Sequence, residues 1–322
     1  MSKCGQIWVN ELRITEFDEK GGVAANSRLT ARLADFGNIT LSGNLSSIGF
    51  GSIEKKVNER QKYNAYQYDF SSTFDVYFFY LLLFFLGSVL MRSAGCIVND
   101  ILDKEFDQKV KRTKERPLAS GKISWKLALI YAFILCLIAL IVLINFNTLT
   151  IILALGSMPL AFTYPLMKRY TYWPQLFLGV TFNYGLILGW TSSSEQISLV
   201  PLVFYFGAIF WTLGYDTIYG YQDIKDDEII GLKSTSIKFK KNAKLFLFIC
   251  YLIFILSYIM GGYLLDFSLM YFSLLIFPVI HLFAYQVKSF KLDNPEKCLV
   301  IFKSNNYFGL IVLLIILIGK LF

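Results

Sequence analysis

The sequence predicts an all-α fold, a polytopic transmembrane bundle of about eight helices around a central cavity. Hydrophobic residues make up 55% of the 322-residue chain and charged residues 17%, which leaves too little polar surface for a water-soluble domain of this length. The apolar residues gather in runs of roughly 20, the length of helix that crosses a bilayer. Loops rich in Lys and Arg alternate with loops that have neither, as they do when successive loops lie on opposite sides of a membrane.

Apolar runs of spanning length follow one another from residue 76 to the C-terminus. They lie near residues 76–98, 127–145, 148–166, 174–192, 198–220, 245–265, 267–287 and 305–322. A spanning helix needs roughly 20 apolar residues to cross a hydrocarbon core of about 30 Å, and each run is close to that length. Each run is therefore expected to form one membrane-spanning helix.

Basic side chains mark one side of the expected membrane. They follow the first run at Lys104, Lys109, Lys111, Arg112, Lys114, Arg116 and Lys122, and they recur within residues 168–169, 225–244 and 288–303. Loops with an excess of Lys and Arg stay in the cytoplasm, so we expect an integral protein of the bacterial inner membrane whose site faces the cytoplasm. The net charge of +8 lies largely in these loops, which fits anionic lipid headgroups of the bilayer better than nucleic acid. No nucleic-acid partner is expected.

Residues 1–72 differ from the rest of the chain. They are mixed in charge, rich in Gly, Asn and Ser, and contain no apolar run that could cross a membrane. If the first spanning run enters the cytoplasm at Asn99, this segment lies on the opposite side, and no secretory signal accounts for its transfer. We therefore expect two parts, an aberrant or disordered polar segment at residues 1–72 and a membrane domain at residues 73–322.

Two acidic clusters lie at the ends of apolar runs, the first within residues 99–107 and the second within residues 216–227. Carboxylates are costly beside hydrocarbon and usually serve a function there. The side chains that repeat every four residues are Asn99, Asp103 and Asp107 in the first cluster and Asp223 and Asp227 in the second. On a helix, such spacing points the oxygen atoms of each cluster in one direction. Hard oxygen ligands arranged in this way suit Mg²⁺ and a diphosphate.

Cationic side chains could complete a phosphate site beside these clusters. Those on the same predicted face of the membrane are Arg112, Arg116, Lys168 and Arg169. Tyr164 lies four residues before Lys168, so a hydroxyl and an ammonium project together from one helix end. Either acidic cluster alone is equally well explained as a solvated loop, and the basic loops alone could serve only to fix orientation. The two acidic clusters together, on one side of the membrane, favour a shared metal site.

Several motifs follow one another in a recognisable order. They are residues 90–100 (LMRSAGCIVND), Asp103, Asp107, and residues 112–113, 116–118, 164–170, 215–219, 223–227, 231–235 and 305–307. From about residue 74 to the C-terminus, this order resembles the UbiA-type intramembrane prenyltransferase family, and within it the 4-hydroxybenzoate polyprenyltransferases of ubiquinone biosynthesis. So many motifs in one order make a chance similarity improbable.

The resemblance implies a magnesium-dependent transfer reaction and assigns roles to individual residues. The first metal and diphosphate motif would comprise Asn99, Asp100, Asp103 and Asp107, and the second Asp223 and Asp227. Arg116, Tyr164 and Lys168 would bind the diphosphate, with Arg112 and Arg169 on the same face. The implied reaction joins the chain of a polyprenyl diphosphate to the ring carbon ortho to the hydroxyl of 4-hydroxybenzoate and releases diphosphate. Asp216 or a neighbouring carboxylate would help to orient or deprotonate the phenol.

Alternatives remain open at this point. Family members usually have nine helices, and the first, with a basic residue near its cytoplasmic end, helps to build the pocket for the aromatic substrate. Here a polar stretch precedes residue 73, so an inactive relative with an altered N-terminus is one alternative, and an enzyme of the same superfamily with another acceptor is a second. An ion-coupled transporter is a third, but it would hold its carboxylates near the middle of the membrane, whereas these lie at helix ends beside Arg and Lys.

Overall fold

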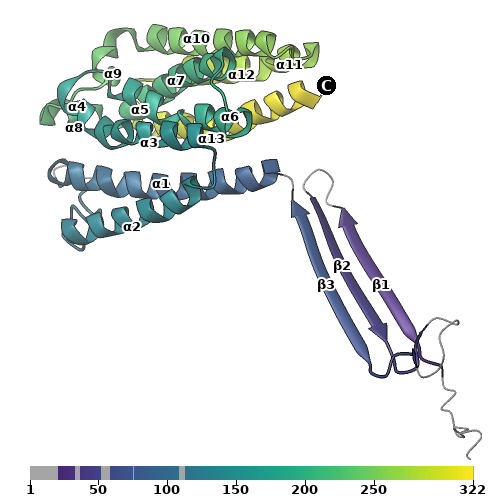
Figure 1. Ribbon diagram of the computed structural model, residues 1–322. Coiled ribbons are helices and arrows are strands. Elements are labelled where there is room, and N and C mark those ends of the chain that lie inside the picture. Colours follow the sequence, from purple (N-terminus) through teal and green to yellow (C-terminus); the bar gives the residue numbers. More distant parts are fainter. Residues whose placement is uncertain (1–20, 33–36, 52–58, 75, 109–112, 322) are drawn as a thin grey trace, which may run out of the picture. The chain divides into compact units, whose positions relative to one another are not determined.

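The computed structural model describes residues 21–32, 37–51, 59–74, 76–108 and 113–321. It divides into two compact units, residues 1–79 and residues 80–322, and each is described by itself. Strands occupy the first unit and helices the second (Figure 1).

A three-stranded antiparallel sheet forms most of the described part of the first unit. Its strands β1 (Ala24–Arg32), β2 (Gly37–Ser46) and β3 (Ala65–Phe74) pair in the order β1-β2-β3. Aromatic and polar residues alternate from Tyr66 to Phe70, which is the pattern of a strand with one apolar and one polar face. The expectation of a helical fold therefore holds for the membrane unit, and the polar segment before it adds a small sheet.

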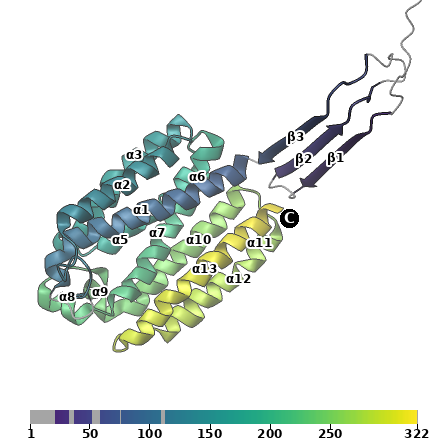
Figure 2. The same cartoon turned by 90° about the horizontal axis from the view of Figure 1, so that it is seen from below.

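Helices of very different lengths build the second unit (Figures 1 and 2). The long helices are α1 (Val76–Asp107), α2 (Trp125–Leu143), α3 (Thr148–Thr163), α7 (Leu199–Gly220), α10 (Ala243–Leu264) and α13 (Pro295–Leu321). The shorter helices are η3 (Tyr164–Leu166), α4 (Met167–Tyr170), α5 (Pro174–Phe182), α6 (Gly185–Ser194), α8 (Ile224–Ile230), α9 (Thr235–Lys238), η4 (Lys240–Asn242), α11 (Leu269–Leu274), α12 (Ile276–Val279) and the π-helix η5 (Ile280–Val287).

Within the described residues, seven helical stretches are long and apolar enough to cross a membrane. They are Phe78–Asp107, Trp125–Leu143, Thr148–Tyr170, Leu199–Gly220, Lys240–Leu264, Leu269–Val287 and Pro295–Lys320. The expectation of about eight spanning helices therefore differs from the structure at one apolar run. The apolar run at residues 174–192 forms two short helices, α5 and α6, instead of one spanning helix.

The side-chain amide of Asn183 lies where α5 gives way to α6. It donates to the carbonyl oxygen of Gly179 at 2.8 Å, to that of Ala208 at 3.2 Å, and to Oγ1 of Thr212 at 2.7 Å. The backbone tightens at the same point, since the N–H of Leu186 donates to the carbonyl of Asn183 three residues back. Two of the amide's acceptors belong to α7, so the sequence of residues 174–192 alone does not reveal this break.

The core of the second unit is built on the contact between α7 and α10, its largest interface between helices. Glycines allow these helices to approach closely, as small residues do in membrane bundles. A Cβ atom on Gly214 would lie 2.4 Å from Cε1 of Tyr251, and one on Gly261 would lie 2.5 Å from Cζ of Phe204. Tyr251 and Phe254 are fully buried there. This packing holds α7 in place, and α7 leads directly into the second acidic cluster.

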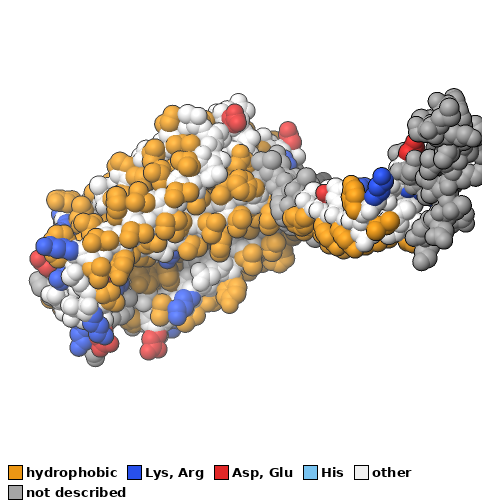
Figure 3. Space-filling model, turned by 60° about the horizontal axis from the view of Figure 1, so that its bottom comes forward, with side chains coloured by type: hydrophobic (Ala, Val, Ile, Leu, Met, Phe, Trp, Pro, Cys, Tyr) orange, Lys and Arg blue, Asp and Glu red, His pale blue; other side chains and the backbone are white. Residues whose placement is uncertain are grey.

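Apolar side chains cover the face of the helical unit seen in Figure 3, where charged side chains are few. Large side chains such as Phe85, Phe133, Ile141 and Leu256 are well exposed on the helices. Such a surface is costly in water and is covered by hydrocarbon in a bilayer. Together with the helices of spanning length, it makes the chain an integral membrane protein.

Candidate functional site

A cavity of about 290 Å³ lies where the C-terminal parts of α1 and α7 approach α8. Figures 1 and 2 both place the C-terminal end of α1 beside α8. Of the predicted site residues, the cavity is lined by Asn99, Asp103, Asp107, Arg116, Tyr164, Lys168, Asp216, Asp223 and Asp227. Both acidic clusters, which are far apart in the sequence, therefore face one cavity.

The first acidic cluster occupies one face of the last turns of α1. Asp103 is 3% exposed and Asp107 is 8% exposed. The chain returns toward α1 after residue 112, so that Nη1 of Arg116 lies 2.9 Å from Oδ1 of Asp100 and 2.9 Å from Oδ2 of Asp107. One guanidinium thus pairs with two carboxylates, which lowers the cost of holding them near hydrocarbon. Oγ1 of Thr113 donates to the carbonyl of Asp107 at 3.1 Å and anchors the same turn.

Lys168 approaches the first acidic cluster from the opposite side of the cavity. The helix α3 tightens into the single turn η3 at Pro165, and α4 then begins, so Lys168 points back toward α1. Its ammonium forms an ion pair with Oδ2 of Asp103. Arg169 points elsewhere, because its guanidinium donates to the carbonyl of Leu102 and lies 5.0 Å over the ring of Phe106. Arg169 therefore joins α4 to α1 without lining the cavity.

The second acidic cluster begins at Asp216 in the last turns of α7 and continues beyond the end of that helix at Gly220. Asp223 immediately precedes α8, and Asp227 lies one turn later on the same face. Gly231 ends α8 in a left-handed conformation, with φ of +81°, which glycine adopts without strain. Asp216 lies on α7 and lines the same cavity.

The predicted site residues thus divide into three groups. The cavity gathers most of them, including every predicted metal ligand. Asp100 and Arg169 lie beside it, Asp100 through its pair with Arg116. Arg112 lies outside the described residues.

Other polar side chains of the cavity were not singled out from the sequence. They are Thr113, Gln175, Tyr219, Lys233 and Ser234. Gln175 is the clearest omission, since it is a buried amide directly after Pro174 at the start of an apolar run, and that position was a usable signal. Thr113, Tyr219, Lys233 and Ser234 lie within the motifs that resemble the family, at residues 112–113, 215–219 and 231–235, but the resemblance assigns no role to them.

Mg²⁺ fits the donor atoms that line this cavity. The residues that could hold it are Asn99, Asp103, Asp107, Asp223 and Asp227. Mg²⁺ binds hard oxygen atoms, typically one or two carboxylates together with substrate phosphates. In the described part of the chain, Oδ1 of Asp103 is buried and accepts no hydrogen bond, a costly state that a cation relieves. Among the same residues, no three carboxylate, thiol or imidazole groups converge tightly enough to hold a metal alone, so phosphate oxygens would complete the coordination.

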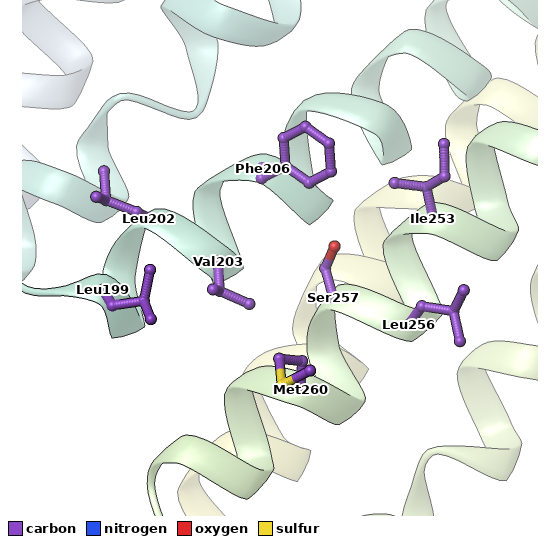
Figure 4. A pocket seen from close by; sticks show the side chains of 8 residues that line it. All are labelled: Leu199, Leu202, Val203, Phe206, Ile253, Leu256, Ser257 and Met260. Carbon is purple, nitrogen blue, oxygen red and sulfur yellow. The ribbon is translucent and has the colours of Figure 1, made fainter.

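A second cavity, of about 460 Å³, lies between α7 and α10 and is apolar. Figure 4 shows its lining, in which Ser257 supplies the single hydroxyl among aliphatic, aromatic and thioether side chains such as Leu202, Phe206, Leu256 and Met260. It contains none of the predicted site residues. Its chemistry suits hydrocarbon and offers nothing to a charged substrate.

Comparison with protein families gives two matches. The UbiA prenyltransferase family matches residues 67–311, which is most of the chain. A family described as motility related/secretion protein matches residues 1–80, the segment that contains the sheet.

Individual relatives agree with the first match. The chain is 42% identical over 240 residues to a mitochondrial 4-hydroxybenzoate polyprenyltransferase from Drosophila pseudoobscura pseudoobscura, covering 74% of this chain and 60% of the relative. It is 44% identical over 246 residues to the enzyme of that name from Bos taurus, covering 75% and 65%. With 4-hydroxybenzoate geranyltransferase 2 from Lithospermum erythrorhizon the identity is 42% over 245 residues, covering 75% and 79%. The chain thus spans 60 to 65% of the length of these two mitochondrial relatives.

Solved structures share the fold of the helical unit. An apo UbiA homolog from Aeropyrum pernix K1 has a TM-score of 0.63 at 22% identity, covering 75% of this chain and 90% of that one. A UbiA homolog from Archaeoglobus fulgidus bound to GPP and Mg²⁺ has a TM-score of 0.56 at 18% identity, covering 74% and 86%. The family match over most of the chain, the relatives above 40% identity and the shared fold lead to one conclusion. The chain belongs to the UbiA prenyltransferase family.

Proposed function

We propose that this chain is a magnesium-dependent 4-hydroxybenzoate polyprenyltransferase of ubiquinone biosynthesis. It would transfer the chain of a polyprenyl diphosphate to the ring carbon ortho to the hydroxyl and release diphosphate. The observation that carries the proposal is the single cavity lined by both acidic clusters, Arg116 and Lys168. The names of the relatives, which are 4-hydroxybenzoate polyprenyl- and geranyltransferases, supply the acceptor and the class of donor.

The polar end of the donor fits the charges of the cavity. Arg116 and Lys168 offer cations to the diphosphate, and the hydroxyl of Tyr164 can donate to one of its oxygen atoms. The proposed ligands of Mg²⁺ are Asn99, Asp103, Asp107, Asp223 and Asp227. When bound, Mg²⁺ would neutralise the charge that develops on the leaving diphosphate. The UbiA homologs from Archaeoglobus fulgidus that were solved with GPP or DMAPP carry Mg²⁺ as well, which supports the pairing of metal and allylic diphosphate.

The reaction breaks one bond, forms another and moves one proton. The allylic carbon–oxygen bond breaks, and its electron pair leaves with the diphosphate held by Arg116 and Lys168. The ring carbon ortho to the phenol then bonds to the allylic carbon, and that ring carbon loses its proton. Asp216 lines the cavity from α7 and is our candidate to orient the phenol or accept a proton.

The helices of spanning length make the chain an integral membrane protein, but they do not specify which membrane. The expectation of a bacterial inner membrane gains no support, because the animal relatives are named as mitochondrial proteins. We propose that the cavity opens on the membrane face that carries the basic loops, since it is lined by Arg116, Lys168 and Lys233.

Turnover in membranes tests this proposal. Membranes containing the chain should convert 4-hydroxybenzoate and a polyprenyl diphosphate to the prenylated acid when Mg²⁺ is present, with a loss of at least about 10³-fold in an Asp103→Ala plus Asp223→Ala variant. Asp293→Ala plus Glu296→Ala is the matched control, because it also removes two carboxylates but lies away from the cavity. Full activity in the first double variant would contradict the assigned site, and absence of product from the unaltered chain would contradict the reaction.

A further inference from the structure

The short helix α8 cannot fix the second acidic cluster by itself. It contains seven residues, fewer than the roughly 12 that an isolated helix needs to be stable. The positions of Asp223 and Asp227 therefore depend on the chain on either side of α8. After α8, residues 231–236 turn back along the bundle, and we call them the return segment. The N–H of Lys233 in this segment donates to the carbonyl of Lys168 at 2.8 Å, which joins the second cluster to the turn that carries the Lys168 cation.

Buried polar side chains fasten the return segment to α5 and α7, and we call Gln175, Thr217, Thr235 and Ser236 the hydroxyl clasp. Gln175 is 7% exposed, and the other three are 0% exposed. Oε1 of Gln175 accepts the N–H of Thr235 at 3.0 Å. The Oγ1 atoms of Thr217 and Thr235 are 2.6 Å apart, and Oγ of Ser236 donates to the carbonyl of Thr217 at 2.8 Å.

The hydrogen bonds of the hydroxyl clasp have a defined direction. Oγ1 of Thr217 donates to the carbonyl of Leu213 at 2.6 Å, and a hydroxyl has a single hydrogen to donate. Thr235 must therefore donate to Thr217, so the chain of bonds runs from the return segment into α7. Each of these groups is buried, and breaking one bond would leave a polar atom without a partner. The return segment is held rigidly for that reason.

The return segment and α5 both approach α7 closely at Gly220. A Cβ atom there would lie 2.4 Å from Oγ of Ser236 and 3.4 Å from Nε2 of Gln175. Gly220 and Gln175 also line the cavity, as do Lys233 and Ser234 of the return segment. The hydroxyl clasp is therefore continuous with the cavity wall that carries Asp216 and Asp223.

We propose that the hydroxyl clasp positions the second acidic cluster relative to Lys168 and thereby sets the geometry of the site for a diphosphate and its divalent cation. This inference rests on the proposed function, because it concerns the same donor site. The clasp threonines and Ser236 act through the return segment and are positioning residues. A diphosphate must reach both sides of the cavity at once, and a displacement of about 1 Å can cost about 100-fold in rate.

The test removes one hydroxyl from the full chain in detergent or nanodiscs. Thr235→Val keeps the shape of the side chain and removes the bond to Thr217. We expect the Mg²⁺ concentration for half-maximal rate and the KM for polyprenyl diphosphate each to rise about 10-fold, while the KM for 4-hydroxybenzoate changes by less than about twofold. Thr235→Ser keeps the hydroxyl, so both values should stay close to those of the unaltered chain. Thr181→Val is the matched control, because among the described residues Oγ1 of Thr181 bonds only the carbonyl of Phe177 in its own helix.

A direct binding measurement separates this inference from the proposed function. Inorganic pyrophosphate with Mn²⁺ is titrated into the unaltered chain and into each variant. If the unaltered chain binds neither, the proposed function fails, and the inference fails with it. If the unaltered chain binds them and Thr235→Val binds equally well, the inference alone is overturned. Should Thr235→Val not accumulate as folded protein, Ser236→Ala replaces it, and unchanged binding in that variant is equally decisive.

Discussion

At the scale of single residues, Lys168 and Asp103 form an ion pair in the wall of the cavity. Asp103 is almost completely buried, and its Oδ2 is neutralised by Lys168 while Oδ1 accepts no hydrogen bond in the described part of the chain. A buried carboxylate deprived of its cation is far more costly than a surface one. The same ammonium is also well placed to bind a phosphate oxygen that enters the cavity.

Lys168→Met should therefore reduce both donor use and stability. We expect kcat/KM for polyprenyl diphosphate to fall about 100-fold, because a preorganised donor to the leaving group is lost. The melting temperature should also fall, since Asp103 loses its partner, and Lys168→Met combined with Asp103→Asn should recover part of that fall. Steady-state kinetics and thermal unfolding in detergent measure the two effects. Lys288→Met, an exposed lysine outside the cavity, is the control, and equal effects in both variants would contradict the role of Lys168.

Spacing along the sequence was enough to find most residues of the site. Asn99, Asp103 and Asp107 share a helix face because they repeat every four residues, and the structure keeps that face toward the cavity. Arg169 was harder to place, because adjacent residues on a helix point in different directions, and Lys168 takes the direction of the cavity. Gln175 stands out in the sequence as an amide at the start of an apolar run, but its hydrogen bond to Thr235 joins distant segments, a contact that local patterns do not contain.

At the scale of elements, the close approach of α7 and α10 helps to fix the position of α7, which carries the start of the second acidic cluster. Gly214 allows Tyr251 to pack directly against the backbone of α7. The hydroxyl of Tyr251 then donates to Oε1 of Gln286 in η5 at 2.5 Å, so the same aromatic side chain ties three helices together. A wider spacing of α7 and α10 would shift α7 and, with it, Asp216 and the start of α8.

Gly214→Ala should destabilise the bundle by about 1–3 kcal/mol, the usual cost of overpacking a tight core. Gly189→Ala offers the opposite case, because a Cβ atom on Gly189 meets nothing within 4 Å. Alanine has the higher helix propensity, so this variant should be neutral or more stable by up to about 1 kcal/mol. Thermal inactivation in detergent distinguishes the two variants. If Gly214→Ala is as stable as Gly189→Ala, α7 and α10 are not packed as tightly as the structure indicates.

The helices themselves were largely predictable from apolar runs, and the exception depends on contacts with α7. Residues 174–192 have the length of a span, but Asn183 bonds to Ala208 and Thr212 of α7 and ends α5. The strands between residues 24 and 74 were not predicted, although the alternation from Tyr66 to Phe70 was a readable signal.

At the scale of the whole molecule, the chain combines two units of different kinds. Every described residue that lines the polar cavity lies between Asn99 and Ser234, in the helical unit. The sheet of the first unit belongs to the segment that matches a different family. The family match of the helical unit also favours the enzyme over the ion-coupled transporter among the alternatives considered.

Removal of residues 1–72 tests the independence of the helical unit. The truncated chain should bind inorganic pyrophosphate with Mn²⁺ with an affinity within about twofold of the full chain, because the described cavity residues are all retained. The measurement is calorimetric titration in detergent, accompanied by thermal unfolding to confirm that the bundle remains folded. A truncated chain that is folded yet no longer binds would assign part of the site to residues 1–72.

The double pairing of Arg116 bears on how the donor and its metal enter the cavity. Arg116 and Lys168 already serve as counter-ions for Asp100, Asp107 and Asp103, so the three carboxylates lie beside two cations. A free diphosphate would have to compete with these carboxylates, and a lone divalent ion would have to compete with the guanidinium and the ammonium. A diphosphate that already carries the divalent ion brings little net charge into a space of low dielectric constant. Its oxygen atoms can pair with the two cations at the same time as the metal pairs with the carboxylates. The donor should therefore be captured together with its metal, as one nearly neutral species.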